Sequence, residues 1–360
     1  MFKRVLIANR GEIAVRIIRA CQEMGIETVA VYSDEDADAM HVRLADYSYN
    51  IGPADASESY LNIDALMEAA ERTEADAVHP GYGFLSEDAD FAEMVTKAGM
   101  TWIGPWADTI RKVGDKDEAR AAMIPSGIPM SKGSTPLTSV EDAVEQAKDV
   151  GYPIILKPVA GGGGKGMLIA NSEDDLRNIL TIIDINKVKY YFEHYIEHSR
   201  HIEVQIVADN YGHVIHLGER ECSLQRRNQK LLEESPSIAL TPDRRAEVGA
   251  LAIKAAKSVH YNNIGTVEFL LDLKTNQFNF MEINPRIQVE HGVTEAVTGI
   301  DLVRTQIRIA AGESLDLQQE DVKFTGHAIE CRINAEDPDN IFMPSPGKID
   351  FFLEPGGPRV

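Results

Sequence analysis

Residues 279–295, NFMEINPRIQVEHGVTE, decide the fold, because polar residues of different chemistry stand at every second position. These residues are Glu282, Asn284, Arg286, Gln288 and Glu290. Alternate side chains of an extended strand point to the same side, so we expect the five to share one polar face. A strand edge that is simply solvated would show the same alternation.

The residues between these positions are apolar and predict a buried face. Ile283, Ile287 and Val289 are expected to point into a core. Pro285 has no amide hydrogen, so it indicates either an edge strand or the point where the strand ends.

A second acidic position lies upstream, in residues 265–277, GTVEFLLDLKTNQ, which read as a strand and a turn. If the turn centres near Thr275, Glu268 and Glu282 lie opposite each other in a hairpin. Two carboxylates about 5 Å apart repel by roughly 3 kcal/mol at an effective dielectric of about 20. A divalent cation such as Mg²⁺ would turn this repulsion into binding, whereas a slipped register would leave both acids in solvent.

The composition is that of a large globular protein. With 360 residues, of which 44% are hydrophobic and 26% charged, the chain is long enough for two or three domains. No apolar run approaches the roughly 20 residues of a membrane span, and we see no signal peptide, so we expect a cytoplasmic protein without a membrane partner. The net charge of -21 argues against nucleic acid as a partner.

Strands and helices alternate along the N-terminal part of the chain. Residues 4–9, a helix from about 12 to 25 and residues 27–33 form a β-α-β unit, which implies a parallel sheet. Strands at 75–81 and 100–105 extend it to an open α/β domain. Later elements are expected as a helix at 141–151, strands at 152–159, 202–209 and 213–221, a helix from 242 to about 259, and strands at 327–333 and 348–357.

Residues 161–166, GGGGKG, match the pattern G-x-G-x-x-G, but the apolar residues after them read as a strand. A dinucleotide-binding fingerprint requires a helix there, and Gly166 stands where a P-loop needs Ser or Thr. We therefore expect a glycine hairpin that lays backbone amides over phosphates and acts as a mobile lid. A plain tight turn is the alternative.

Two lysines are placed to bind phosphate. Lys157 ends the strand before the glycine run, and Lys116 begins a helix, where backbone amides and a cation can bind an anion together. Either lysine could equally be a solvated surface residue.

Several long segments resemble biotin carboxylases, the ATP-grasp component of biotin-dependent carboxylases. They are GGGGKGM, ERECSLQRRNQK, FMEINPRIQVEHGVTE and GHAIECRINAED, together with IANRGEIAVRIIRA and HPGYGFLSED near the N-terminus. The resemblance implies an α/β and α+β fold with a Rossmann-like N-terminal domain at 1–114. An ATP-grasp domain would follow at 115–324, with a glycine-rich lid at about 130–195, and then the start of a C-terminal domain at 325–360, which suggests truncation.

The same resemblance implies that ATP phosphorylates bicarbonate to carboxyphosphate, which delivers CO₂ to N1 of biotin on a carrier protein. Glu268, Glu282 and Asn284 would hold Mg²⁺ or Mn²⁺. The ATP contacts would be Lys116, Lys157, Gly163, Gly164, Lys165, Gly166, Glu193, His194, Ile196, His201, Gln225 and Gln229. Bicarbonate would lie against Arg286, Gln288, the backbone of Val289 and Lys230.

Three further residues would serve the chemistry in this family. Glu290 would be the general base, Arg332 would stabilise the negative oxygen that develops on biotin, and Tyr82 would border the biotin pocket. The structural alternatives are an ion pair of Arg286 with Glu282 or Glu290, an ion pair of Arg332 with Glu330 or Glu336, and simple packing for Tyr82.

The implied partners are a biotin carboxyl carrier protein or domain, a carboxyltransferase subunit and, in full-length chains, a second copy in a homodimer. An ATP-binding or assembly module without turnover is an alternative from another functional class. A nicotinamide oxidoreductase is disfavoured, because the first β-α turn, ANRGEI, holds one glycine and no fingerprint.

Overall fold

The computed structural model of the chain describes residues 1–159, 166–185, 187–358 and 360. The predicted glycine lid therefore falls largely outside the described residues. The described chain forms two units, Met1–Glu330 and Cys331–Val360. Within the described ranges, no helix has the length and apolar character that a membrane span requires.

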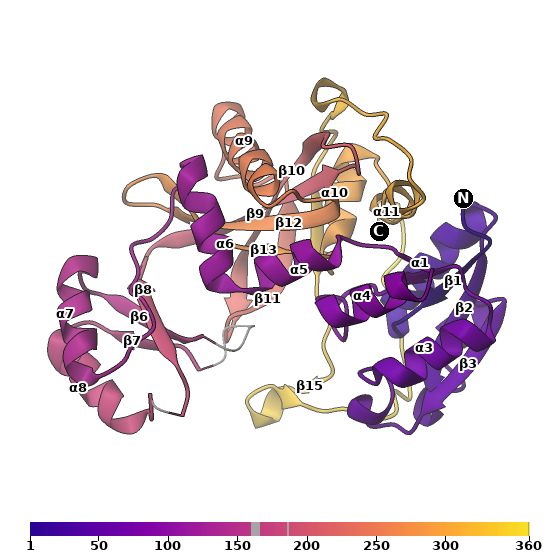
Figure 1. Ribbon diagram of the computed structural model, residues 1–360, viewed down its shortest axis with the longest axis horizontal. Coiled ribbons are helices and arrows are strands. Elements are labelled where there is room, and N and C mark those ends of the chain that lie inside the picture. The colour runs from indigo at the N-terminus through magenta and orange to yellow at the C-terminus, as the bar shows by residue number, and fades with distance from the viewer. Residues whose placement is uncertain (160–165, 186, 359) are drawn as a thin grey trace. The chain divides into compact units, whose positions relative to one another are not determined.

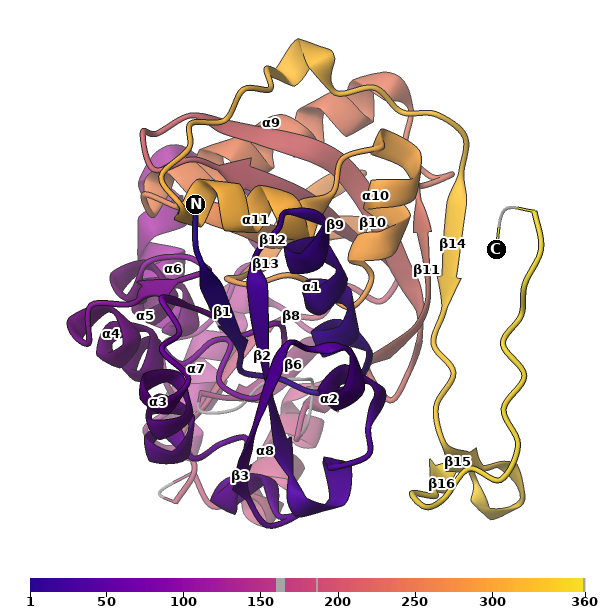
Figure 2. The ribbon, with the colours of Figure 1, turned by 90° about the vertical axis from the view of Figure 1, so that its right-hand side faces the viewer.

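The N-terminal part of the first unit is built on a parallel sheet of five strands in the order β3-β2-β1-β4-β5. Strands β1, β2 and β3 of this sheet are labelled in Figure 2. Its strands are β1 (Arg4–Ile7), β2 (Glu27–Ser33), β3 (Tyr47–Gly52), β4 (Ala77–His79) and β5 (Thr101–Trp102). Its helices are α1 (Gly11–Glu23), α2 (Met40–Leu44), α3 (Ile63–Arg72), α4 (Ala89–Lys97) and α5 (Ala107–Gly114). All of β1 is buried, as expected for the central strand of a parallel sheet that is covered on both faces. The predicted β-α-β unit and its parallel pairing are confirmed.

A lid lobe, residues 131–195 without 160–165 and 186, follows this domain and lies at the left of Figure 1. It contains β6 (Ile154–Pro158), β7 (Leu168–Ala170) and β8 (Tyr190–His194), paired antiparallel in the order β7-β6-β8. Helices α7 (Val140–Val150) and α8 (Glu173–Ile182) cover the sheet. Both begin at a serine whose hydroxyl accepts a backbone N–H, the usual N-cap arrangement. The lobe has a hydrophobic core of its own.

The largest sheet has six strands in the order β13-β12-β9-β10-β11-β14. Their bounds are β9 (Ser199–Ala208), β10 (Val214–Arg226), β11 (Gln229–Ser235), β12 (Asn263–Asp272), β13 (Gln277–Asn284) and β14 (Ala328–Cys331). The helices around it are α6 (Lys116–Met123), α9 (Pro242–Ser258), α10 (His291–Thr298) and α11 (Leu302–Ala310). Between them, these elements supply the side chains of the candidate site.

Strand periodicity sends the polar residues of β9 to one face of this sheet. Ile202, Val204 and Ile206 belong to the same core cluster as residues of α9. Side chains alternate along a strand, so His201 and Glu203 point to the opposite face. On that face, apolar residues of the sheet share a second core cluster with α11 and α1, which ties the N-terminal sheet to the larger one.

The predicted acidic hairpin is confirmed. Glu268 of β12 is the cross-strand partner of Glu282 in β13. A β-bulge follows at once, because Phe269 is paired with Phe280 and Met281 is the extra residue. Strand β13 lies at the sheet edge and ends one residue before Pro285, as the missing amide hydrogen predicts.

The expectation that the five polar residues share one strand face is wrong, because only Glu282 and Asn284 of them belong to β13. Residues 285–290 have no strand structure, because Pro285 ends the ladder and the chain turns into α10. Ile287 is fully buried as predicted, but Val289 is only half-buried. The polar residues of this segment therefore meet through a turn and not through strand alternation.

The second unit, Cys331–Val360, contains one short antiparallel pair among its described residues. Its strands are β15 (Glu336–Asp337) and β16 (Met343–Pro344). The strand predicted at 327–333 is present but shorter than expected, and it forms β14. The prediction of a strand at 348–357 is wrong, because that segment has no strand structure. Its apolar residues Ile349, Phe351, Phe352 and Leu353 are exposed, so within this unit they have no layer to pack against.

Candidate active site

A largely buried ammonium group links three carboxylates on the polar face of the six-stranded sheet. Lys230 of β11 donates hydrogen bonds to Glu203, to Glu268 Oε1 at 2.9 Å and to Glu290 Oε1 at 2.8 Å. Glu203 comes from β9, Glu268 from β12, and Glu290 from the turn that precedes α10. We call Lys230, these three acids, His201 and Arg220 the floor cluster.

Arg220 of β10 is fully buried and fixes Glu203 from the other side. Its Nε donates to Glu203 Oε1 at 2.5 Å. Its remaining donors reach Gln205 Oε1 at 2.7 Å, Thr266 Oγ1 at 3.0 Å and Thr294 Oγ1 at 3.0 Å. A buried ion pair of this kind is tolerated because hydrogen bonds satisfy the rest of the guanidinium.

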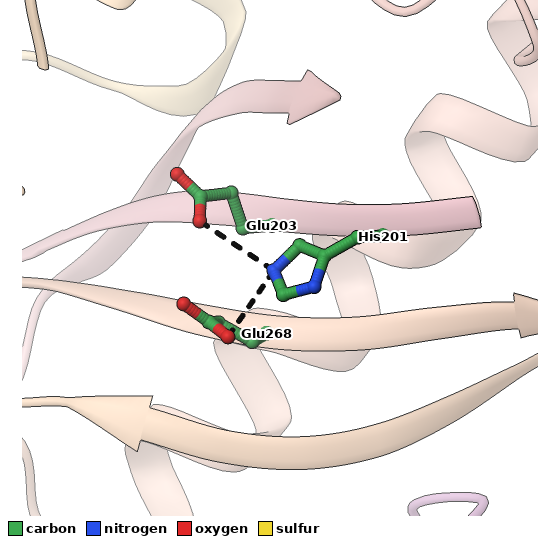
Figure 3. A group of neighbouring side chains, drawn as sticks. All are labelled: His201, Glu203 and Glu268. Carbon is green, nitrogen blue, oxygen red and sulfur yellow. Dashed lines mark ion pairs between the residues drawn. The ribbon is translucent and has the colours of Figure 1, made fainter. Parts of the chain in front are cut away.

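Figure 3 shows His201 between the carboxylates of Glu203 and Glu268. His201 Nε2 lies 3.1 Å from Glu268 Oε2 and 3.8 Å from Glu203 Oε2. The ligand atoms of the three residues lie within 4.8 Å of one another, a spacing that a metal ion could bridge. We assign no metal to them, because Lys230 already supplies a positive charge to both carboxylates.

Three members of the floor cluster, Glu203, Glu268 and Lys230, have pKa values that their neighbours shift. Burial would raise the pKa of Glu203, but Lys230 and Arg220 outweigh it and lower that pKa to about 2. The same competition, with Lys230 and His201 as the cations, lowers the pKa of Glu268. Burial would lower the pKa of Lys230, but its three carboxylates hold it well above the usual value. These three groups are therefore stabilised in their charged forms.

The two hairpin acids offer ligands that suit a divalent cation. Asn284 Nδ2 donates to Glu268 Oε1 at 2.9 Å, so the amide lies beside the first carboxylate. The side chain of Glu282 keeps contact with solvent. Even so, the surrounding protein desolvates the carboxyl group, and this effect raises the pKa of Glu282. The negative charge of Glu268 raises it further. A cation would reverse that shift, and carboxylate and amide oxygens are ligands that Mg²⁺ and Mn²⁺ prefer.

Arg286 and Gln288 lie just beyond the hairpin and contact each other. Arg286 Nη1 donates to Gln288 Oε1 at 2.8 Å and to the Ile287 carbonyl at 3.2 Å. Gln288 is 4% exposed, and its Nε2 has no partner among the described residues. An unpaired buried donor costs about 1–3 kcal/mol, so this amide indicates an acceptor on a ligand.

The ion pair of Arg286 is formed with the N-terminal domain. Arg286 Nε donates to Glu87 Oε1 at 2.5 Å. The alternative pairing with Glu282 or Glu290 is not found in the described chain, where Glu290 is bound by Lys230 instead.

Glu290 is fully buried and stands at the N-cap position of α10. Cys222 of β10 lies close to it, since ligand atoms of Glu203, Cys222 and Glu290 are within 4.8 Å of one another. Burial raises the pKa of the Cys222 thiol well above its usual value. The thiol therefore stays protonated and does not act as a nucleophile.

A second charged cluster joins the lid lobe to α6, and we call it the lid cluster. Glu193 of β8 accepts hydrogen bonds from Lys157 Nζ at 2.6 Å and from Arg120 Nη1 at 2.8 Å. The three side chains keep between 16% and 27% of their surface exposed. The ammonium of Lys116, at the start of α6, lies 5.8 Å from the ring centre of Tyr191, which also belongs to β8.

His194 is the last residue of β8, and the chain leaves the lid sheet after it. The backbone amide of His194 donates to the Lys132 carbonyl at 2.8 Å, and His194 Nδ1 lies 3.1 Å from the Gly151 carbonyl. Both contacts lie within the lid lobe. Ile196 is half-buried just beyond the end of β8.

Gln225 and Gln229 lie near Lys230 in the ladder of β10 and β11. Gln225 is the cross-strand partner of Lys230, and both glutamines are exposed. Tyr82 is half-buried and packs beside the core that contains α1, while its carbonyl accepts from Asn9 Nδ2 at 2.7 Å. This packing agrees with the structural alternative for Tyr82, and its place beside biotin stays a prediction.

Four predicted residues are not brought to the site by the described structure. Gly163, Gly164 and Lys165 lie outside the described residues, although Gly166 is described and has a φ of +75°. Arg332 belongs to the second unit, Cys331–Val360. The role predicted for Arg332 stays a prediction.

Sequence reasoning missed Glu203, Arg220, Arg120 and Glu87. Glu203 had a usable signal, because a charged residue inside the apolar run IEVQIVAD of a buried strand requires a partner. Arg120 and Glu87 lie in segments rich in charge, KDEAR and SEDAD, where nothing distinguishes a site residue from a solvated one.

The chain matches two family models over most of its length. Residues 1–110 match the model described as biotin carboxylase, N-terminal domain. Residues 115–318 match the model described as carbamoyl-phosphate synthase L chain, ATP binding domain.

Relatives and solved structures agree with these matches. Biotin carboxylase 1 of Bacillus subtilis is 55% identical over 99% of this chain and 81% of its own length. The 2-oxoglutarate carboxylase small subunit of Hydrogenobacter thermophilus is 50% identical over 99% of this chain and 77% of its own. The crystal structure of the biotin carboxylase domain of that carboxylase, with MgADP, ADP and bicarbonate, superimposes with a TM-score of 0.93 at 49% identity, over 99% of this chain and 80% of the other. This chain therefore belongs to the biotin carboxylase family.

Proposed function

We propose that the chain carries out the ATP-dependent carboxylation of biotin, the first half-reaction of a biotin-dependent carboxylase. The observation that carries the proposal is the floor cluster, in which Lys230 binds both Glu290 and Glu268. A candidate base, a cation and one acid of the hairpin thus share one hydrogen-bonded centre. The solved relative that contains MgADP and bicarbonate supports the same substrates for this chain.

Glu268, Glu282 and Asn284 would hold Mg²⁺ or Mn²⁺. The cross-strand pairing of the two acids and the raised pKa of Glu282 support this assignment. When bound, the metal neutralises the negative charge on phosphate oxygens. The residues of this chain then orient the triphosphate relative to bicarbonate.

ATP would lie between the lid lobe and the six-stranded sheet. Its proposed contacts are Lys116, Lys157, Gly163, Gly164, Lys165, Gly166, Glu193, His194, Ile196, His201, Gln225 and Gln229. Lys157 is held by Glu193 at 2.6 Å and is half-buried, so it is ready to exchange that carboxylate for a phosphate oxygen.

Bicarbonate would bind at the turn that follows the hairpin. The unpaired, buried Nε2 of Gln288 and the guanidinium of Arg286 offer donors to a planar anion. The backbone of Val289 and the ammonium of Lys230 complete the proposed set. This location puts the anion next to Glu290, because Glu290 is bound to the same Lys230.

Glu290 would act as the general base. It removes the proton of bicarbonate, whose oxygen attacks the γ-phosphorus of ATP, so that carboxyphosphate forms and ADP leaves. Breakdown of carboxyphosphate gives CO₂ and phosphate, and N1 of biotin attacks CO₂ after losing its proton, which Glu290 relays to the released phosphate. Arg332 would stabilise the negative oxygen that develops on the ureido ring, and Tyr82 would border the biotin.

The proposed partners follow from this half-reaction. A biotin carboxyl carrier protein or domain presents the biotin, and a carboxyltransferase subunit consumes the carboxybiotin. A homodimer and a cytoplasmic location also remain predictions. We keep the domain boundaries at 1–114, 115–324 and 325–360 as a proposal.

Phosphate release from ATP tests the function. We expect hydrolysis that depends on bicarbonate, rises when free biotin is added and stops when EDTA removes the divalent cation. An ATP-binding module without turnover would bind ADP but show none of these dependences. Hydrolysis at the same rate with and without bicarbonate would contradict the proposal.

A further inference from the structure

The guanidinium of Arg286 is held by protein groups on two of its edges. Glu87 Oε1 accepts from Nε at 2.5 Å, and Gln288 Oε1 accepts from Nη1 at 2.8 Å. A planar guanidinium held at two nitrogens cannot turn about its last bonds. The orientation of the remaining nitrogen, Nη2, is therefore set by Glu87 and Gln288 together.

Glu87 comes from a loop that the N-terminal sheet places at its ligand-binding edge. The loop, residues 80–88, follows β4, and β1 is the neighbouring strand. The chain runs from β1 outwards to β3 and then returns to β4 on the other side, so the strand order reverses between β1 and β4. Open α/β sheets bind ligands at the carboxyl ends of strands where this reversal occurs.

The loop is built to keep a fixed shape. Asn9, just after β1, donates from Nδ2 to the Pro80 carbonyl at 2.8 Å and to the Tyr82 carbonyl at 2.7 Å. A Cβ at Gly81, whose φ is +65°, would come within 3.0 Å of Asn9 Nδ2, so the close approach requires glycine. Phe84 stacks on Tyr60 with ring centres 5.0 Å apart. The loop therefore delivers Glu87 to one place.

We propose that Glu87 is a positioning residue for bicarbonate. It acts through Arg286, whose guanidinium it turns so that the remaining donor faces the same anion as Gln288 Nε2. The inference rests on the function proposed above and extends it to the N-terminal domain. It gives that domain a part in substrate recognition through Arg286.

Exposure argues that this ion pair serves orientation rather than folding. The side chain of Glu87 is 48% exposed, and that of Arg286 is 20% exposed. Pairs with one well-hydrated partner contribute little to stability. Glu93 of α4 is 41% exposed and pairs with Lys97 at 2.6 Å and with Arg111 at 3.2 Å, so it provides a matched control with different partners.

The test compares Glu87→Gln and Glu87→Asp with the control Glu93→Gln in bicarbonate-dependent ATP hydrolysis. We expect Glu87→Gln to raise KM for bicarbonate about tenfold, the effect of losing one charge-assisted hydrogen bond. KM for ATP should stay within about twofold of wild type. Glu87→Asp should recover part of the loss, because it keeps the charge at a greater distance. Glu93→Gln should leave both constants and the melting temperature unchanged.

A double-mutant cycle with Arg286→Lys identifies the route of the effect. If Glu87 acts through the guanidinium, adding Glu87→Gln to Arg286→Lys should change KM for bicarbonate no further. Fully additive effects would overturn the proposal, and so would an unchanged KM in Glu87→Gln. A lower KM in Glu87→Gln would overturn it as well, because Glu87 would then compete with bicarbonate for Arg286.

The outcomes are separable from failure of the proposed function. Wild-type protein that hydrolyses no ATP in response to bicarbonate contradicts the function itself. Wild-type protein that responds, beside a Glu87→Gln variant with the same KM for bicarbonate, contradicts only the role of Glu87.

Discussion

The floor cluster and the lid cluster use the same residue types in different surroundings. In the floor cluster, Glu203 and Arg220 are fully buried, and Arg220 reaches four different partners. In the lid cluster, Glu193 is shared by Lys157 and Arg120, and all three keep some exposure to water. The first cluster stands on a six-stranded sheet, and the second joins a three-stranded sheet to one helix.

The difference shows how one site can combine rigidity with exchange. A buried charge cannot leave its partners without a large desolvation penalty, so the floor cluster keeps Glu290 and Glu268 in place before substrate arrives. Lys157 can leave Glu193 at a lower cost, because water and Arg120 remain to satisfy that carboxylate. The floor cluster is therefore suited to the proposed chemistry, and the lid cluster to the proposed binding and release of ATP.

The largest expected effect is on the proposed base. Glu290→Gln keeps the shape of the side chain but removes its ability to accept a proton, so biotin carboxylation should fall by about 10²–10⁴-fold. ADP affinity, measured by calorimetry, should stay within a few-fold of wild type because the lid cluster is untouched. Carboxylation at the wild-type rate would eliminate Glu290 as the base.

The next largest effect is expected in the free energy of unfolding, which should fall more for a variant in the floor cluster than for one in the lid cluster. Glu203→Gln leaves Lys230 and Arg220 buried without their shared anion and should lower the free energy of unfolding by about 3–5 kcal/mol. Glu193→Gln, in the more hydrated cluster, should lower it by about 1 kcal/mol or less. Urea titrations of both variants check the difference. Equal losses would mean that burial does not distinguish the clusters.

The third prediction concerns how the stability contributed by the floor cluster depends on pH in the acid range. The pKa of Glu203 is lowered from 4.5 to about 2 in the folded protein. A carboxyl whose pKa is depressed by folding contributes stability above its unfolded pKa and loses it as pH falls towards the folded value. The advantage of wild type over Glu203→Gln should thus be complete above pH 4.5 and shrink by up to about 3 kcal/mol as pH falls towards 2. A constant difference in urea titrations across this window would contradict the shift.

The smallest effect is expected at the lid. Arg120→Gln leaves Glu193 with Lys157 alone, so Lys157 should be held more firmly and KM for ATP should rise about tenfold, the effect of one charge-assisted hydrogen bond. KM for bicarbonate should not change. Arg177→Gln, which removes a surface pair with Glu173 in the same lobe, is the control. A tenfold rise in the control as well would show that any charge loss weakens the lid.

The sequence predicted those features that depend on short spacings. The symmetry of residue numbers around Thr275 placed Glu268 opposite Glu282, and the structure confirms the pair. The N-terminal β-α-β unit was equally readable from its periodicity. The polar set beyond Pro285 was predicted to share a strand face, and it meets instead through a turn that strand periodicity cannot describe.

Contacts between distant segments were not predictable in this way. Arg286 and Glu87 are 199 residues apart, and Arg120 and Glu193 are 73 apart. Nothing in a charged surface motif says which distant charge it will meet, because the meeting depends on how sheets and helices pack. The strand predicted at 348–357 failed for a related reason, since a strand forms only where a neighbour offers hydrogen bonds.

The core that α1 and α11 share with the six-stranded sheet has a consequence for modularity. Family models divide the chain between residues 110 and 115, yet the apolar side chains on the two sides of that division pack as one cluster. Dividing the chain there would expose apolar surface on both fragments. The first hundred residues thus match a family model of their own but would not be expected to stay soluble alone. Grafting them onto another protein would require redesigning the apolar surface that α11 now covers.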